Sequence, residues 1–337
     1  MEQNKTGKYL KYAIGEIILV VIGILIAIQI NNKNQESKSE AKIDAIFEDI
    51  MDELALNIEE TTKVIRFYKD KDSMASIVLY GEFYDKPFTK KYILNSKSLN
   101  ILWSLPSTEE QMFFSDKAFT NLASNADAIP TKYTTIFKEL YVLYAKDQML
   151  VKSYNVEMKN KADSNVKERE QFEWYSLFPF AVIKNEGFID YVLNDFRYKN
   201  KVRIVYTDGI LRLLKYTTDY RNKAISCYQK IGALLNKSNV DDSFKINQKT
   251  IDLLVGTWKT ESIPDVTFTT YVENDRLYSK STRDTLITEF IPLSDSELLV
   301  YYPEGFYYVT WQLIDKKIKW SNNLESLIYE RVEDSVK

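Results

Sequence analysis

The chain of 337 residues contains no histidine. This absence excludes Ser-His-Asp and Cys-His catalysis, histidine-bearing zinc sites and pH sensing by an imidazole. A single cysteine, Cys227, excludes an intramolecular disulfide and a thiolate metal cluster. Only 9 glycines occur, with neither a P-loop nor a G-x-G-x-x-G fingerprint, so the familiar nucleotide enzymes are excluded. The sequence therefore predicts no catalytic group, no cofactor and no metal site.

The chain also lacks an excess of charge of either sign. Its net charge is -3, so no strong basic field exists to hold a nucleic acid. We therefore expect lipid, protein or small-molecule partners rather than DNA or RNA.

Residues 13–30 form an almost unbroken apolar run close to the N-terminus. At about 1.5 Å per residue, a helix over this run is roughly 27 Å long, close to the hydrocarbon thickness of a bilayer. The run lacks the small-residue cleavage site that ends a signal peptide. We therefore expect an uncleaved transmembrane anchor, with the lipid bilayer as its partner.

The orientation of this anchor is predicted from the short basic tail, residues 1–12. The positive-inside count is a tie, because three lysines precede the run and three follow it closely. A very short basic tail is typical of a signal-anchor. This form predicts a protein of the inner (cytoplasmic) membrane with a cytoplasmic N-terminus and a periplasmic body.

Four residues of the run are candidate functional positions. Glu16 is an ionisable residue one turn inside the span; either it has a function within the membrane, or it reaches the headgroups or stays protonated. Gly15, Gly23 and Ala27 recur on one helix face, and Gly23 with Ala27 forms a small-xxx-small pair that permits close helix approach. This pair predicts self-association or docking on a partner's helix.

Residues 31–235 are predicted to form an antiparallel helical bundle. From Ile43 to Tyr68, apolar residues recur at spacings of three and four, and no proline or glycine interrupts residues 31–80. The membrane helix is therefore expected to continue into the body as one long rod, acting either as a passive stalk or as a relay of motion.

Further along the bundle, Ser107 and Glu110 stand at the positions of a capping box, which predicts a helix start there. Residues 152–171 are strongly charged and are expected to project into solvent. The aromatic stretch 172–180 either closes the end of the bundle or forms a docking patch for a partner or a membrane surface. A last helical stretch over 187–235 is expected to break near residues 199–201.

The C-terminal region, residues 251–337, follows a polar linker over residues 236–250. Its apolar residues alternate with a period of two in 266–272, 298–302 and 306–313, with turn signals between them. About eight short strands are expected, curled into a small antiparallel barrel or half-barrel. The predicted fold class is therefore α+β and multidomain.

Two family resemblances add to this description. The run KYLKYAIGEIILVVIGILIA at 8–27, followed by QINN at 29–32 and by the ELALN motif at 53–57, resembles a family of single-pass membrane proteins widespread in Bacteroidetes. The resemblance covers roughly residues 5–235. It implies membrane attachment and a helical body, and no activity is assigned to that family.

The second resemblance is to lipocalins. Gly256-Thr257-Trp258 opens the first predicted strand as the lipocalin G-x-W motif does, and Arg331 lies in the last strand. The resemblance implies that Arg331 packs over Trp258 as a cation–π contact that closes the barrel base, a structural role. The region is much shorter than a full lipocalin, so a small apolar ligand is only a secondary expectation.

The leading functional interpretation is a non-enzymatic, membrane-anchored envelope protein that serves as a binding or scaffold subunit of a larger complex. One alternative is an extracytoplasmic sensor that relays ligand state through its membrane helix to a partner. Another is a carboxylate-dependent envelope hydrolase, for which Glu109-Glu110 and Asp241-Asp242 are the candidate pairs.

Overall fold

The structure of the protein is a computed structural model. It describes residues 3–95, 99–177, 184–237, 248–273, 276–283, 287–294, 296–302, 305–321 and 325–332. Within these ranges, the side chains of residues 3–18 and of a few short stretches further on are not described.

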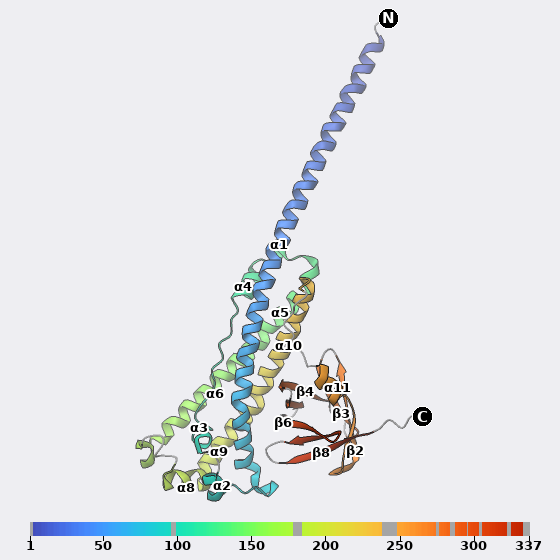
Figure 1. The fold of residues 1–337 in the computed structure, drawn as a ribbon. Helices are drawn as coiled ribbons and strands as arrows, with labels where there is room; N and C mark the ends of the chain where they lie inside the picture. The colour runs from blue at the N-terminus through green and yellow to red at the C-terminus, as the bar shows by residue number, and fades with distance from the viewer. Residues whose placement is uncertain are drawn as a thin grey trace.

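The first element, α1 (Gln3–Tyr80), is one uninterrupted helix of 78 residues. At 1.5 Å per residue it is about 117 Å long. Figure 1 shows its N-terminal part as a rod that projects far beyond the body, and its C-terminal part as the central helix of the bundle. The absence of proline and glycine from residues 31–80 allows this continuity, because these two residues weaken a helix most.

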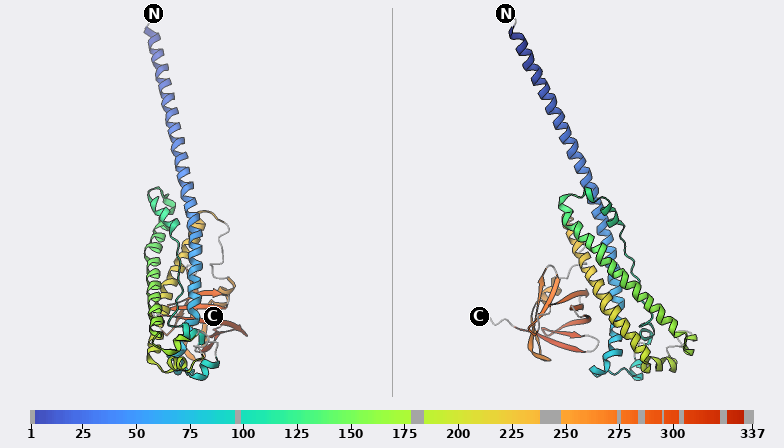
Figure 2. Two further views of the ribbon diagram at one scale, coloured as in Figure 1. Left: turned by 90° about the vertical axis from the view of Figure 1, so that its left-hand side faces the viewer. Right: turned by 180° about the vertical axis from the view of Figure 1, so that it is seen from behind.

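Two further long helical segments lie along the lower half of α1. One descends through α5 (Thr134–Val142), η4 (Leu143–Asp147) and α6 (Gln148–Arg169), and the other returns through η6 (Val205–Leu213) and α10 (Leu214–Leu234). The views of Figure 2 confirm that the three segments lie side by side. Two of their turns, η4 and η6, are π-helical, a wider winding that often marks a specialised position.

Short elements connect these segments at the two ends of the bundle. They are η1 (Gly81–Tyr84), α2 (Lys90–Asn95), α3 (Leu99–Ser104), α4 (Lys117–Ser124), η2 (Ala126–Ala128), η3 (Thr131–Tyr133), η5 (Glu173–Ser176), α8 (Glu186–Asn194) and α9 (Phe196–Ile204).

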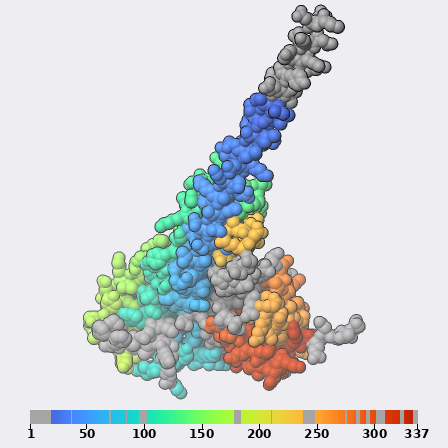
Figure 3. All heavy atoms as spheres, turned by 45° about the horizontal axis from the view of Figure 1, so that its top comes forward, coloured from blue at the N-terminus to red at the C-terminus, as the bar shows by residue number. Residues whose placement is uncertain are grey.

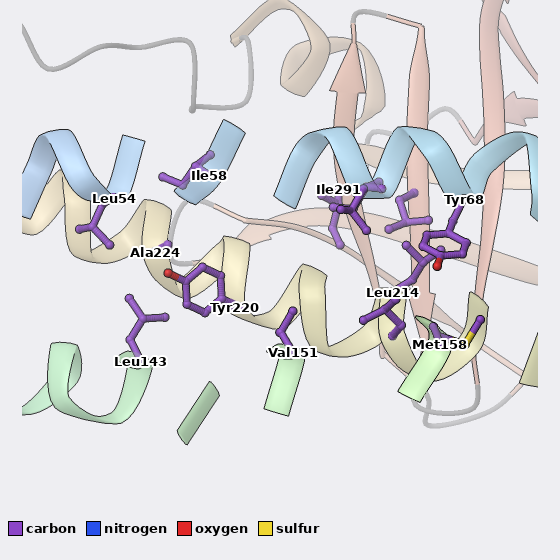
Figure 4. Close-up of a cluster of buried hydrophobic side chains, with 14 of the residues drawn as sticks. Leu54, Ile58, Tyr68, Leu143, Val151, Met158, Leu214, Tyr220, Ala224 and Ile291 are labelled. Atoms are coloured by element: carbon purple, nitrogen blue, oxygen red, sulfur yellow. The ribbon is translucent and has the colours of Figure 1, made fainter. Parts of the chain in front are cut away.

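The core of the bundle is formed by the apolar stripe of α1. Leu54 and Ile58 of α1 have no exposed surface, and Figure 4 shows them facing Tyr220 and Ala224 of α10. Leu143 of η4 approaches from the segment that α5, η4 and α6 form. Burying side chains of this size contributes about 1.5–3 kcal/mol each. The stripe therefore attaches α1 firmly to the body from Ile43 onward.

The C-terminal region is a closed eight-stranded antiparallel barrel in which each strand pairs with the next and β8 returns to β1. A short helix, α11 (Gln248–Leu254), precedes it. The strands are β1 (Gly256–Thr260), β2 (Ile263–Glu273), β3 (Arg276–Ser281), β4 (Ile287–Ser294), β5 (Glu297–Tyr302), β6 (Gly305–Ile314), β7 (Lys317–Ser321) and β8 (Ser326–Arg331). Closure leaves no open sheet edge.

The barrel contacts the bundle through its outer surface. Ile291 of β4 and Leu299 of β5 are buried in the helical core, and Figure 4 places Ile291 beside α1. Next to them, Asn222 Nδ2 of α10 donates a 3.2 Å hydrogen bond to Glu289 Oε1 of β4. Burial raises the pKa of Glu289 above its ordinary value, and Arg276 opposes this rise.

The structure confirms the α+β class, the helical region and the C-terminal barrel, and it shows the barrel to be closed. The aromatic stretch packs at the end of the bundle as far as it is described, since Trp174 is buried and Phe172 and Tyr175 contact the core. Residues 178–180 lie outside the described part, as do residues 238–247 of the predicted linker. Residues 248–250 begin α11.

Three local predictions are wrong. No helix starts at Ser107, because the backbone that follows it is held by side chains of other helices. The Ser107 Oγ donates a hydrogen bond back to Trp103 O. The charged segment after residue 152 does not project into solvent: Met158 and Ala162 are buried, because η6 packs along α6 and Lys161 pairs with Asp208 at 2.6 Å.

The third wrong prediction is the helix break near residues 199–201. The chain breaks instead at Asp195, whose carboxylate accepts a 2.8 Å hydrogen bond from Arg197 N and caps α9. A side-chain cap of this kind stabilises a helix start by about 1 kcal/mol.

Candidate functional site

The candidate positions of the anchor lie in the N-terminal part of α1. Gly15 and Glu16 fall outside the residues whose side chains are described. A Cβ placed on Gly23 would meet nothing within 4 Å, and Ala27 is exposed. The structure therefore brings no protein group against the small residues of this helix among the residues that it describes.

The apolar side chains around these residues are exposed as well. Nine of them, from Leu19 to Ile30, keep between 48% and 74% of their surface accessible. They occur at nearly every position, so they surround the helix, and Figure 3 shows this part of the rod standing clear of the body. Within the part of the chain whose side chains are described, no helix combines the length and hydropathy needed to cross a membrane. Residues 13–18 of the predicted span lie outside that part.

The three barrel residues Gly256, Trp258 and Arg331 come together at the junction of β1 and β8. Trp258 and Arg331 are register partners, and the Arg331 guanidinium lies 5.4 Å from the centre of the Trp258 ring. Arg331 also donates to Val255 O, and Trp258 Nε1 donates a 2.9 Å hydrogen bond to Leu254 O. These contacts join β1 to the end of α11, and β8 to the residue between α11 and β1.

Gly256 is required at this junction by its backbone and its surroundings. Its φ of +144° is a conformation that side chains with a Cβ rarely adopt. A Cβ there would lie 2.8 Å from Arg331 Nε. Glycine at this position therefore lets the arginine cross the start of β1.

The interior of the barrel is occupied by its own side chains. Leu298, Val309 and Trp311 are buried in one apolar cluster. Leu277, Phe290 and Ile318 belong to the same cluster, whereas Phe306 lies outside the residues whose side chains are described. These side chains take up the described part of the interior.

A buried polar network, which sequence reasoning missed as a site, lies between α1 and α4. The Glu53 carboxylate accepts from Ala118 N at 3.0 Å and Phe119 N at 3.3 Å, so it caps the N-terminus of α4. It also accepts from the Tyr144 hydroxyl at 2.8 Å and from Ser115 Oγ at 2.8 Å. Burial raises the pKa of Tyr144, so the phenol remains a donor.

Asn57, one turn after Glu53, completes this network. Its Oδ1 accepts from Ser115 N at 2.9 Å, and its Nδ2 donates to Ser115 O at 2.9 Å and to the Tyr220 hydroxyl at 3.1 Å. The ELALN motif therefore has a physical role, because its two polar residues bind the segment that enters α4. The signal in the sequence was a pair of polar residues, four apart, beside an apolar stripe.

A second buried network holds the loop after α3. Lys71 Nζ donates to Ser104 O at 3.0 Å and to Thr108 O at 2.8 Å, and Arg169 donates to Trp103 O. The Arg169 guanidinium also lies 4.2 Å from the centre of the Trp103 ring. Because backbone carbonyls occupy these two cations, the network fixes a loop and leaves little donor capacity for a ligand.

Asp72 lies next to Lys71 but faces a different environment. It is 5% exposed, and burial raises the pKa of its carboxyl to about 7. Among the described residues no hydrogen bond or ion pair to its carboxylate is found. A buried acid of this kind is held protonated by its environment.

Of the carboxylates proposed for a hydrolase, Glu109 accepts a 3.5 Å hydrogen bond from Gln111 Nε2 in an irregular segment before α4. Asp241 and Asp242 lie outside the described residues. Within the described ranges, no group of three or more acidic or cysteine side chains is arranged to hold a metal ion.

We predict that Glu53→Gln lowers the free energy of unfolding by about 2–3 kcal/mol, because an amide donor then faces the amides of α4. Chemical denaturation followed by circular dichroism measures this change. The exposed neighbour variant Asp52→Asn is the control and should shift stability by less than about 0.5 kcal/mol. Equal effects of the two variants would show that Glu53 does not cap α4.

We further predict that Asp72→Asn stabilises the protein at pH 8 by about 2–4 kcal/mol. The folded protein retains the Asp72 proton to about pH 7, whereas the unfolded chain releases it near 3.8. The wild-type protein therefore loses stability as the pH rises between these values, and the variant does not. Denaturation midpoints measured from pH 4 to 8 test this, with the exposed Asp49→Asn as control. Parallel profiles for wild type and Asp72→Asn would contradict the prediction.

Comparison of the chain with family models, curated proteins and solved structures gives no match.

Proposed function

We propose that the protein is a membrane-anchored, non-enzymatic binding or scaffold subunit of an envelope complex. The observation that carries this proposal is the continuity of α1, whose apolar N-terminal part is exposed while its C-terminal part forms the bundle core. In this proposal residues 13–30 are a transmembrane helix, and the chain belongs to the Bacteroidetes family that its first residues resemble.

The distribution of apolar residues favours lipid over a protein groove as the cover for this helix. Side chains from Leu19 to Ile30 are exposed around the helix axis. A single partner helix covers one stripe of its neighbour, whereas an all-round apolar helix belongs in a bilayer or a large core. A protein contact at Gly23 and Ala27 is compatible with lipid on the remaining faces.

The polar groups of the body support binding rather than catalysis. Glu53, Lys71 and Arg169 are buried charged groups, and each is engaged by backbone groups of neighbouring segments. The C-terminal barrel, proposed to be lipocalin-like, contributes an outer surface that packs on the bundle through Ile291 and Leu299. These features suit a rigid body presented at a distance from a membrane.

A sensor is the second candidate function, and the same continuous helix favours it. Displacement of α10 or of the barrel against the lower half of α1 would be transmitted along the rod. A sensor of this kind would pass its signal to a partner in the membrane. In both proposals the N-terminus is cytoplasmic and the body periplasmic.

The anchor is tested by alkaline extraction of membranes that contain the full chain. We predict that the wild-type protein stays in the membrane pellet, and that the double variant Ile22→Lys/Ile24→Lys moves to the supernatant. Each lysine near the centre of a span costs on the order of 3 kcal/mol. The matched control is Asn32→Lys/Asn34→Lys, two exposed polar positions just beyond the span. Release of the wild-type protein, or equal release of both double variants, would contradict the anchor.

A further inference from the structure

One flank of the bundle carries two arginines from segments far apart in the sequence. Thr62 and Arg66 lie one turn apart on α1, and Arg221 lies on α10. Arg221 Nε donates a 2.9 Å hydrogen bond to Thr62 Oγ1. The Thr62 hydroxyl in turn donates to Ile58 O at 2.8 Å, so its proton is already used. This hydrogen bond holds Arg221 against the same face of α1 that carries Arg66 one turn further on.

In the described part of the chain, which does not include the Asp70 side chain one turn after Arg66, no carboxylate forms an ion pair with Arg66 or Arg221. Their neighbour Lys63, by contrast, is paired with Glu59 at 3.2 Å and Glu60 at 2.8 Å. Burial, together with the charge of Arg66, lowers the pKa of Arg221 to about 10. Arg221 is half-buried, and a cation that loses part of its hydration is normally paired with an acid in proteins.

We propose that Arg66 and Arg221 bind a phosphate-like oxyanion as their counterion. Guanidinium groups carry only N–H donors and no acceptor, so their ligand must supply acceptor oxygens and negative charge. Two cations match the charge of a phosphoryl dianion, and the planar fork of arginine suits its oxygens. The site gives a ligand class to the binding role proposed above and rests on that role only for its biological setting.

The position of the site separates a soluble ligand from a lipid headgroup. From residue 30 to residue 62 the continuous helix rises about 48 Å. Headgroups next to the proposed anchor therefore lie far from Arg66. The oxyanion belongs to a soluble ligand or to a phosphorylated group on a partner.

Thermal unfolding of the full chain in neutral detergent tests the site with inorganic phosphate at constant ionic strength. We expect a saturable rise in Tm of about 3–5 °C at ten times the Kd. The exposed Arg66→Ala should weaken phosphate binding at least tenfold. Arg66→Glu should raise the Tm without phosphate, because it supplies the carboxylate that Arg221 lacks, and should abolish the response.

Matched controls separate this site from general effects. Lys63→Ala changes an adjacent exposed cation and should retain the phosphate response. Asp70→Asn is a second control, because Asp70 follows Arg66 by one turn and its side chain is not among those described. The Tm of this variant should still rise with phosphate. Micelles containing phosphatidylglycerol form the lipid arm.

Three results would overturn the proposal. The first is no response of the wild-type protein to millimolar phosphate. The second is a Tm that rises linearly with phosphate, without saturation, and equally in the wild-type protein and in Arg66→Glu. Such a rise is the general effect of phosphate on protein surfaces. The third is a rise in Tm that depends on Arg66 and that the phosphatidylglycerol micelles produce but inorganic phosphate does not. Because the protein is in detergent throughout, the outcome does not depend on whether residues 13–30 span a membrane.

Discussion

The burial of one face of α1 in the bundle is the constraint on which the rest of the structure depends. From Ile43 to Val78 this face contributes to nearly every part of the helical core, and the barrel reaches the same core through Ile291 and Leu299. The first part of the same helix shares none of these contacts among the residues described. One element therefore has two environments, and the stability of the body fixes the direction of the exposed rod.

Buried polar groups determine how the shorter segments attach to this helix. Glu53 and Asn57 hold the entry to α4, and Lys71 with Arg169 holds the loop after α3. Each hydrogen bond of this kind contributes on the order of 1 kcal/mol, and leaving a buried partner unsatisfied costs more. The networks therefore specify a single arrangement of segments that have little regular structure of their own. Arg66 and Arg221 stand apart because no carboxylate of the described chain pairs with them.

The sequence predicted what depends on local periodicity. The stripe from Ile43 to Tyr68 indicated the buried helix, and the alternation in residues 266–272 indicated a strand of the barrel. Prediction from the sequence failed where long-range contacts determine the backbone conformation. The helix expected at Ser107 does not form because Lys71 and Asn155 bind the carbonyls that a helix would use. The Arg66 and Arg221 site joins residues more than 150 positions apart, and no local pattern announces it.

The central claim is that α1 is one rigid helix from its exposed apolar part into the core. A spin-label distance between Asn34→Cys and Lys63→Cys tests it directly; both positions are exposed, and the native Cys227 is buried and therefore shielded from labelling. A continuous helix predicts one narrow distribution centred at about 43 Å between the two backbone positions. A broad distribution, or a clearly shorter distance, would show that the helix bends or breaks between its two environments and would contradict the account.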